Sequence, residues 1–277
     1  MTKDMTREVV LEAGTADREY FRDIWRYREL FYILAWRDIS VRYRQTSLGI
    51  AWAAIRPLVA TVVFTVVFGR LGKFPSGGLP YPVLVLSGML PWQLFSSALT
   101  ESGRSLVANG NLVTKVYFPR LIIPGSSLVT SLIDFSISAL MLTVLMGFYG
   151  LVPQWQLVFL PVFALVALIA AAGVGIWIAA LAVKYRDFLL AVPFLVQLGL
   201  YLSPVGFSSA VVPLRWRLLY SLNPMVGVID GFRWCILGSN VELQPVSLAC
   251  SALLGAAVLT TGIVYFRRTE RGFADVI

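Results

Sequence analysis

The residues best able to take part in chemistry are an acid and several serines inside a long apolar stretch. Asp134 shares one helical face with Ser127, Ser131 and Ser138, at spacings of 4, 3 and 4 residues. An ionisable group inside a membrane is costly, so it indicates either a hydrated path or a specific ion pair. Small hydroxyl residues also favour hydrogen-bonded packing between helices. The face is therefore interpreted as the lining of a path or as a packing contact, and the sequence leaves both open.

A second group of candidates lies just before the first apolar stretch, where charged and aromatic residues mix. Tyr32, Trp36, Ile39 and Tyr43 recur at spacings of 4, 3 and 4, which places them on one side of a helix with arginines around the rest. This composition is typical of an amphipathic helix in a membrane interface. The helix either anchors the first span or acts as a gate that contacts whatever passes between the helices. The residues assigned to that gate are Trp36, Arg37, Arg42, Tyr43, Arg44 and Arg56.

Arg56 is a charged residue within the first apolar span, about 12 Å from its start at Leu48 by the rise of a helix. Such a side chain either snorkels toward the lipid headgroups or points inward toward Asp134. Pro57 follows directly, and it is accommodated if one short helix ends at Arg56 and another begins. We expect the chain to turn into the membrane at Gly49, which permits the change of direction.

Composition excludes several classes of enzyme. The 277 residues include no histidine, which excludes a Ser-His-Asp triad and a histidine metal site. Cys235 and Cys250 lie fifteen residues apart without a CxxC spacing, so neither a zinc site nor a disulfide is indicated. No catalytic residue and no metal site are predicted. The net charge of +8 comes from basic residues that flank apolar spans, which favours contact with anionic lipid over nucleic acid.

The elements that must position these residues are predicted to be membrane-spanning helices. The chain is 58% hydrophobic and 14% charged, whereas a soluble domain is about 25% charged. We predict an all-α polytopic membrane protein with an amino-terminal cytoplasmic segment (1–27), an interfacial amphipathic helix (28–47) and a transmembrane domain of six helices (48–277). The six predicted spans are Leu48–Gly69, Tyr81–Leu99, Leu121–Tyr149, Leu157–Val183, Phe188–Phe207 and Val246–Phe266.

Lysine and arginine residues near the span ends predict the orientation. The side with the larger number carries Arg28, Arg37, Arg42, Arg44, Arg104, Lys115, Arg120, Lys184, Arg186, Arg267, Arg268 and Arg271. The opposite side carries Arg70, Lys73, Arg215, Arg217 and Arg233. Basic residues are enriched in cytoplasmic loops, so the first side, and with it both termini, is predicted to be cytoplasmic.

The segment between predicted spans five and six, "VVPLRWRLLYSLNPMVGVIDGFRWCILG", is too broken to cross a membrane and too apolar for an ordinary loop. Pro213 and Pro224 each restrict the helix around them. We expect two short helices that re-enter the outer leaflet or lie on it. A break in the backbone at that depth needs protein or a water-filled cavity around it.

The first span carries a stripe of alternating residue types on one face: Thr61, Phe64, Thr65 and Phe68. Such a stripe presents rings and hydroxyls to a sugar if it faces a path. Alternatively, the phenylalanines face lipid and each threonine bonds to its own backbone. The residues alone do not separate these interpretations.

Several motifs, taken in order, resemble the membrane subunit of type 2 ABC transporters that export polysaccharides. They are "LAWRDISVRYRQTSLGIAWAAIRPL", "VFTVVFGR", "SGMLPWQLFSSAL", "NGNLVTKVYFPRLIIP", "KYRD", "SP" in the fifth predicted span and "LNPM". The resemblance runs from about Arg28 to the carboxyl terminus and is greatest to permeases for lipid-linked O-antigen and teichoic-acid chains. It implies that the chain lies in a bacterial cytoplasmic membrane.

The resemblance also implies a homodimer whose translocation path lies at the dimer interface, bordered mainly by spans one and five. Residues of this chain that match the path are Trp52, Thr61, Phe64, Phe68, Tyr201 and Phe207. Each subunit of such transporters docks a separate nucleotide-binding subunit that holds ATP and Mg²⁺. The chain itself lacks a GxxxxGK[ST] loop and needs no cofactor. Residues that match the coupling surface are Asn111, Lys115, Tyr117, Phe118, Pro119, Arg120, Arg186 and Asp187.

Two other classes of function compete with polysaccharide export. A type 2 ABC permease for a lipid or drug has the same architecture. A polyprenyl-phosphate-dependent membrane enzyme needs several polar groups that converge near the membrane surface. The predicted outer side offers only Asp230 and Glu242 as acids, which disfavours the enzyme.

Overall fold

The structure of the protein is a computed structural model, which describes residues 17–44, 51–238 and 243–273. Every regular element in these ranges is helical, in agreement with the predicted all-α class. The elements are α1 (Asp17–Arg26), α2 (Arg28–Arg44), α3 (Ala51–Phe64), η1 (Thr65–Leu71), α4 (Tyr81–Ala108), α5 (Gly110–Lys115), α6 (Ile122–Phe148), η2 (Trp155–Phe159), α7 (Leu160–Lys184), α8 (Asp187–Leu202), η3 (Ser209–Val211), α9 (Leu214–Tyr220), α10 (Pro224–Leu237), α11 (Pro245–Thr269) and η5 (Glu270–Gly272).

Five stretches of the described chain are long and apolar enough to cross a membrane: Ala51–Leu71, Tyr81–Ala108, Ile122–Phe148, Trp155–Lys184 and Pro245–Thr269. The remaining predicted span corresponds to α8, whose 16 residues extend about 24 Å. That is shorter than the roughly 30 Å of hydrocarbon in a bilayer. The structure therefore supports a multi-pass membrane protein, with five spans of full length among the described residues.

The predicted end of α8 at Phe207 is wrong, because the helix stops at Leu202. Ser203 has an extended backbone, with φ −100° and ψ 151°. Pro204 comes next, and the ring of a proline disfavours a helical conformation in the residue before it. The chain from Ser203 to Phe207 is consequently a non-helical segment at the end of α8.

Two other boundaries differ from the prediction. Helix α4 continues past Leu99 to Ala108, because Glu101 and Arg104 neutralise each other across one turn, with 2.5 Å between Oε2 and Nη2. Pro57 lies inside α3, so no new helix begins there. The predicted start of the span at Leu48 and the turn at Gly49 lie outside the described residues.

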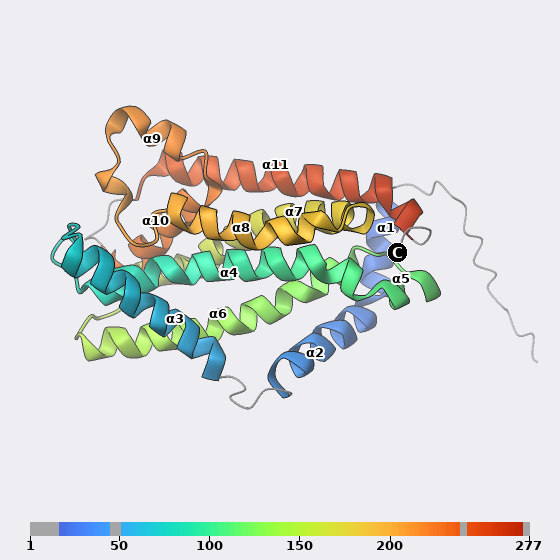
Figure 1. Ribbon diagram of the computed structural model, residues 1–277, viewed down its shortest axis with the longest axis horizontal. Coiled ribbons are helices and arrows are strands. Elements are labelled where there is room, and N and C mark those ends of the chain that lie inside the picture. Colours follow the sequence, from blue (N-terminus) through green and yellow to red (C-terminus); the bar gives the residue numbers. More distant parts are fainter. Residues whose placement is uncertain (1–16, 45–50, 239–242, 274–277) are drawn as a thin grey trace, which may run out of the picture.

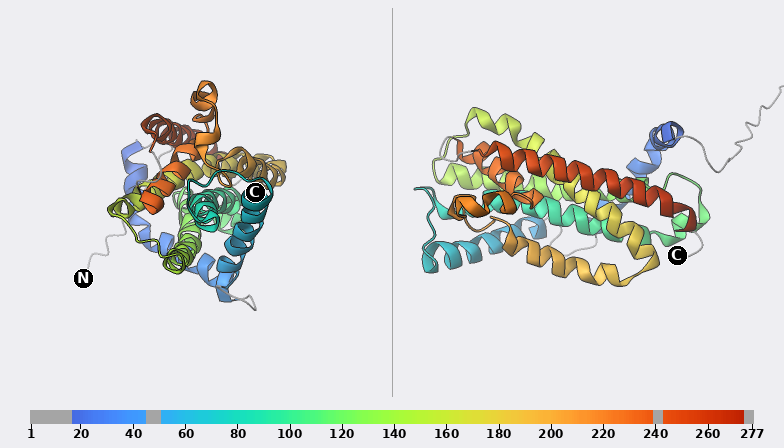
Figure 2. Two further views of the ribbon diagram at one scale, coloured as in Figure 1. Left: turned by 90° about the vertical axis from the view of Figure 1, so that its left-hand side faces the viewer. Right: turned by 90° about the horizontal axis from the view of Figure 1, so that it is seen from above.

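Helix α4 is the centre of the bundle, as the view along the helices in Figure 2 shows. It packs against α6, α7 and α10, and α7 packs in turn against α11. Gly173 explains the close approach of α7 and α11, because a Cβ atom there would lie 2.6 Å from the backbone nitrogen of Leu259. Close packing is thus the role of this glycine.

The shorter elements gather at the two ends of the bundle (Figure 1). Helices α1, α2 and α5 lie toward one end, here called the α5 end, and α9 and α10 lie at the other, called the α10 end. Helices α9 and α10 are the two short helices predicted between the last two spans, separated at Ser221–Asn223. Helix α10 is buried along most of its length, so it is part of the bundle.

Candidate functional site

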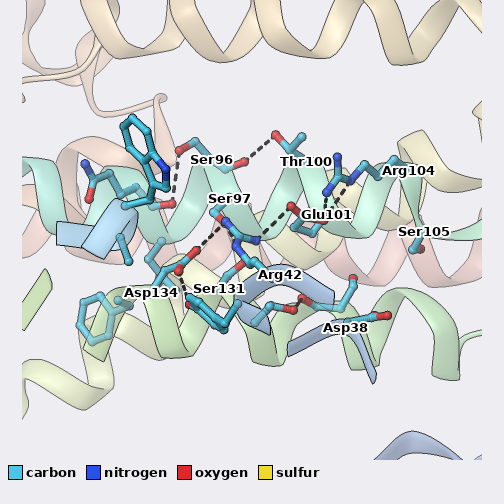
Figure 3. Close-up of a pocket in the computed structure, with 18 of the residues that line it drawn as sticks. Asp38, Arg42, Ser96, Ser97, Thr100, Glu101, Arg104, Ser105, Ser131 and Asp134 are labelled. Carbon is cyan, nitrogen blue, oxygen red and sulfur yellow. Dashed lines mark hydrogen bonds and ion pairs between the residues drawn. The ribbon is translucent and has the colours of Figure 1, made fainter. Parts of the chain in front are cut away.

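A cavity of about 990 Å³ lies between α2, α3, α4 and α6 (Figure 3). Its charged lining residues are Arg37, Asp38, Arg42, Arg56, Glu101, Arg104 and Asp134. Hydroxyl groups complete much of the wall, from Ser96, Ser97, Thr100 and Ser105 of α4 and from Ser127, Thr130, Ser131 and Ser138 of α6. The wall of the cavity therefore carries many polar and charged groups although the helices around it are largely apolar.

Arg42 ties three helices together across this cavity. Its Nη2 atom lies 2.6 Å from Oδ2 of Asp134 on α6, and its Nη1 atom lies 3.1 Å from Oε1 of Glu101 on α4. The side chains of Arg42, Glu101 and Asp134 are 28%, 19% and 21% exposed. Asp134 thus has the partner that an intramembrane acid requires, and that partner is Arg42 of α2. Arg56 lines the same cavity, but the ion pair belongs to Arg42.

Tyr43 strengthens the contact between α2 and α6 by donating a hydrogen bond from its hydroxyl to Oδ1 of Asp134. Burial raises the pKa of the Tyr43 hydroxyl well above its ordinary value, and the bond to Asp134 raises this pKa further. The hydroxyl therefore remains a protonated donor at physiological pH. Glu101 is shared between Arg42 and Arg104, so the network extends along α4 toward the α5 end.

The serines predicted to share a face with Asp134 all line the cavity. The Ser131 hydroxyl lies 3.0 Å from that of Ser97 on α4, which joins the two helices. Ser127 donates to the carbonyl of Pro124 at 2.8 Å, and Ser138 donates to the carbonyl of Asp134 at 3.0 Å. This face therefore packs against α4 at one position and borders the cavity along its length.

Helix α2 has one side packed on the bundle and one side exposed. Leu34 is buried in a cluster with Phe31 and the start of α6, which fixes the helix on the bundle. Tyr32 and Trp36 lie on the other side and are 67% and 59% exposed. The predicted aromatic stripe is thus divided, because Tyr43 at its end turns to Asp134.

The remaining gate candidates on α2 and α3 take different positions. Arg37 is exposed and pairs with Asp38 at 2.7 Å, and Arg44 is exposed at the end of α2. Trp52 lines the cavity beside Arg56 at the beginning of α3. The structure brings Arg37, Arg42, Tyr43 and Arg56 to one cavity, whereas Arg44 does not line it.

An aromatic cluster lies at the far end of the first span. The rings of Phe64 and Phe68 stack with centroids 5.4 Å apart, and Phe68 lies 5.6 Å from Phe74 and 6.5 Å from Phe207. The sequence analysis did not select Phe74 as a path residue, because it lies in a loop after the span and does not continue the helical spacing of Phe64 and Phe68. Phe64, Phe68, Phe74 and Phe207 are called the phenylalanine cluster below.

The other three predicted path residues, Trp52, Thr61 and Tyr201, lie outside this cluster, and Trp52 lines the cavity. Thr61 is buried and its hydroxyl donates to the carbonyl of Pro57 at 2.7 Å, as expected for a threonine bonded to its own helix. Tyr201 is 61% exposed near the end of α8. The sequence stripe on the first span therefore combines a backbone-bonded threonine with clustered phenylalanines.

The residues predicted to couple to a nucleotide-binding subunit divide into exposed and buried members at the α5 end. Asn111, Lys115, Tyr117, Arg186 and Asp187 are exposed, and Asn111 and Arg186 border a second cavity of about 260 Å³. Phe118 and Pro119 are buried. Arg120 donates to the carbonyl of Glu270 and lies 5.9 Å from the ring of Phe273, so it ties this loop to the carboxyl-terminal end.

Glu101 is a functional candidate that the sequence interpretation missed, because the predicted second span ended at Leu99. The spacing of Glu101 and Arg104, three residues apart, was an available signal that the helix continues. The contact between Glu101 and Arg42 had no such signal, since the two residues belong to different helices.

The fold and the site together define a multi-pass helical membrane protein with a charged cavity beside its first span. Residues 29–237 match the protein family described as ABC-2 type transporter. The chain belongs to this family. It is therefore a membrane permease subunit and not an enzyme, and ATP hydrolysis is carried out by a separate subunit.

The similarity to individual relatives extends over nearly the whole chain. The chain is 31% identical over 263 residues to the O-antigen export system permease protein RfbA of Myxococcus xanthus, which covers 92% of this chain and 98% of that one. It is 25% identical over 250 residues to the protein of the same name from Klebsiella pneumoniae, covering 90% and 95%. It is 22% identical over 244 residues to the polysialic acid transport protein KpsM of Escherichia coli, covering 84% and 91%.

Proposed function

We propose that this chain is the membrane subunit of an ATP-driven exporter that moves a lipid-linked polysaccharide across the bacterial inner membrane. The observation that carries the proposal is the cavity bounded by α2, α3, α4 and α6, because its lining suits both parts of such a cargo. Arginines are good donors to phosphate oxygens, and hydroxyl groups exchange hydrogen bonds with sugars. The relatives named for O-antigen export and polysialic acid transport support the same cargo class.

In the proposed orientation the α5 end faces the cytoplasm, with both termini on that side. The predicted distribution of lysine and arginine supports this placement. Cargo then meets the membrane at the side where α2 lies across the bundle, and the cavity beside Arg42 is its first polar surface.

The proposed assembly is a homodimer with two separate nucleotide-binding subunits. The first span supports a dimer because its outer face is apolar and exposed, including Leu58, Val59, Val62 and Val63. In the membrane this face meets lipid or a second copy of the chain. ATP and Mg²⁺ belong to the nucleotide-binding subunits, which dock on the exposed residues of α5 and of the turn after α7.

The network around Arg42 suggests how docking reaches the cavity. The Arg42, Glu101 and Arg104 side chains form a continuous chain of ion pairs from α2 along α4 toward α5. A rigid-body movement of the docked subunit shifts α5 and the adjoining end of α4. Such a shift changes the distance between Glu101 and Arg42, and so it strengthens or weakens the hold of α4 on α2.

The proposed function is tested by removing the protein from a cell that makes a lipid-linked surface polysaccharide. We expect surface polysaccharide to disappear and its lipid-linked form to accumulate inside the cell. Normal surface polysaccharide after removal would contradict the proposal. In parallel, the chain is co-expressed and co-purified with the nucleotide-binding subunit that is encoded beside it. Failure of the two to form a complex would contradict the proposed assembly.

The cargo class is tested with the purified complex in lipid vesicles. Lipid-linked polysaccharide should stimulate ATP hydrolysis, and free polysaccharide of the same composition should not. Stimulation by a hydrophobic drug or a phospholipid alone would instead assign the chain to permeases for those substrates.

A further inference from the structure

Three successive backbone carbonyls in the segment after α8 each accept a hydrogen bond from a side chain of another helix. Arg233 on α10 donates from Nη2 to the carbonyl of Val205 at 2.9 Å and from Nη1 to that of Phe207 at 2.7 Å. Tyr81 at the start of α4 donates to the carbonyl of Gly206, between them, at 2.8 Å. The segment Val205–Phe207, called the platform below, is thereby fixed to two helices of the bundle.

Arg233 is an unusual residue for this place, because only 1% of its surface is exposed. Removing a guanidinium from water is costly unless its donors are satisfied. Here the two terminal nitrogens of the planar fork match two carbonyls, whereas Nε has no hydrogen-bond partner among the described residues. Asp230 is buried on the same helix. Gly88 leaves the necessary space, since a Cβ atom there would lie 2.9 Å from both Arg233 Nη2 and the Val205 carbonyl oxygen. An apolar side chain would fill the space but could not hold the segment.

The first span rests directly on the platform. A Cβ atom on Gly206 would lie 2.7 Å from the ring of Phe64 and 3.0 Å from the ring of Phe68. The two rings therefore pack on the bare backbone of Gly206, and Phe207 adds its own ring to the phenylalanine cluster. The contact joins the far half of the first span to the bundle at the α10 end (Figure 1).

The two sides of this contact differ in how firmly they are held. Only 11% of the apolar window of the first span is buried inside the chain, compared with 72% for α4, to which the platform is bonded. The far part of the first span, η1, is also a π-helix, a geometry often found at functional sites. The first span is thus the loosely packed partner, and the platform is the fixed one.

We propose that Arg233 is a positioning residue that holds Val205–Phe207 as a fixed platform, against which the outer half of the first span closes through Phe64 and Phe68. The proposal rests on the proposed function, because closure at this point matters only if cargo passes beside the first span. Arg233 touches neither the cavity nor the proposed cargo. It acts through the position of the phenylalanine cluster.

The position of the platform is tested by hydrogen exchange in the purified complex, which does not depend on the cargo. In Arg233→Gln we expect amide exchange in Ser203–Phe207 and Thr65–Leu71 to rise about tenfold or more, as for a lost charge-assisted hydrogen bond. Exchange in α6 and α7 should stay unchanged. The matched control is Cys235→Ala, which truncates a buried side chain of the same helix and leaves the hydrogen bonds of Arg233 to the platform in place. Equal exchange in the platform of wild type and Arg233→Gln, or a rise throughout the bundle, would overturn the proposal.

Two further variants keep this test decisive if the single substitution fails to fold. Asp230→Asn with Arg233→Gln removes both buried ionisable side chains together with the fork, so it should show the same local rise. Arg233→Lys keeps the charge and part of the donor capacity, so platform exchange should lie between wild type and Arg233→Gln. If the platform amides of this double variant exchange as slowly as those of the wild type, the fork does not hold the platform.

Export by the same variants shows whether the platform acts through the cluster. If it does, Arg233→Gln and Phe207→Leu should be non-additive, and the double variant should export no less than the poorer single variant. Additive losses would overturn a role through the cluster. If removal of the whole chain leaves surface polysaccharide unchanged, the proposed function fails. The exchange result then still decides whether Arg233 holds the platform.

Discussion

Arg42 of α2 and Asp134 of α6 form an ion pair with 2.6 Å between Nη2 and Oδ2, and this pair connects the helix outside the spans to the third predicted span. Asp134 also accepts the hydroxyl of Tyr43, so two neighbouring residues of α2 converge on one carboxylate. The pair is only partly exposed, which makes the loss of one partner more costly than the loss of an exposed pair. The position of α2 over the cavity therefore depends on a specific contact.

Neutralising one member of this pair should destabilise the protein and reduce export. We expect Asp134→Asn or Arg42→Gln to cost about 1–3 kcal/mol, because each leaves a half-buried group without its partner. The unfolding midpoint of the purified complex measures this effect. Arg44→Gln is the control, since Arg44 lies exposed on the same helix. The double variant Arg42→Gln with Asp134→Asn should recover part of the stability, and an additive loss would contradict the pairing.

Arg56→Leu separates a lining residue from an anchor in the headgroups. Arg56 faces the cavity that also contains Arg42 and Trp52, so we expect its loss to reduce export without lowering the unfolding midpoint. Arg56→Lys should retain more export, because the positive charge remains. Both quantities are measured on the same membranes. Wild-type export by Arg56→Leu, with normal assembly, would leave snorkelling as the account of this residue.

Tyr117 and Phe118 are neighbours with opposite environments and should respond oppositely to alanine. Phe118 is 4% exposed, so Phe118→Ala should lower stability by about 3–5 kcal/mol through lost packing. Tyr117 is 68% exposed, so Tyr117→Ala should leave stability unchanged and weaken binding of the nucleotide-binding subunit. Thermal unfolding and co-purification measure the two effects. Undiminished co-purification of Tyr117→Ala would remove Tyr117 from the coupling surface.

Gly173→Ala should disrupt the contact of α7 with α11. The added methyl group would meet the backbone of Leu259 at 2.6 Å, a distance that requires the helices to separate. A shift of this kind typically costs about 1–3 kcal/mol. Gly147→Ala is the control, because nothing lies within 4 Å of its added methyl group. The comparison of their unfolding midpoints tests the packing, and equal midpoints would argue against it.

Local patterns in the sequence predicted the helices but not all of their ends. The long apolar stretches of α6, α7 and α11 are properties of consecutive residues, and their predicted boundaries agree with the structure within a few residues. The predicted end of α4 came too early in the sequence, and the predicted end of α8 came too late. In the first case the charges that suggested an end are paired, and in the second a proline stops the helix.

Contacts between distant residues required the tertiary structure. Asp134 was recognised as an acid in need of a partner, and the sequence suggested Arg56, but the packing of α2 on α6 selects Arg42. Arg233 was counted among the basic residues of the outer side, yet it is buried and bonded to carbonyls of another segment. Residue type and spacing along the chain thus determine where helices form and which polar groups need partners. The choice of partner depends on how the helices pack, because hydrogen bonds and ion pairs form only within a few ångströms.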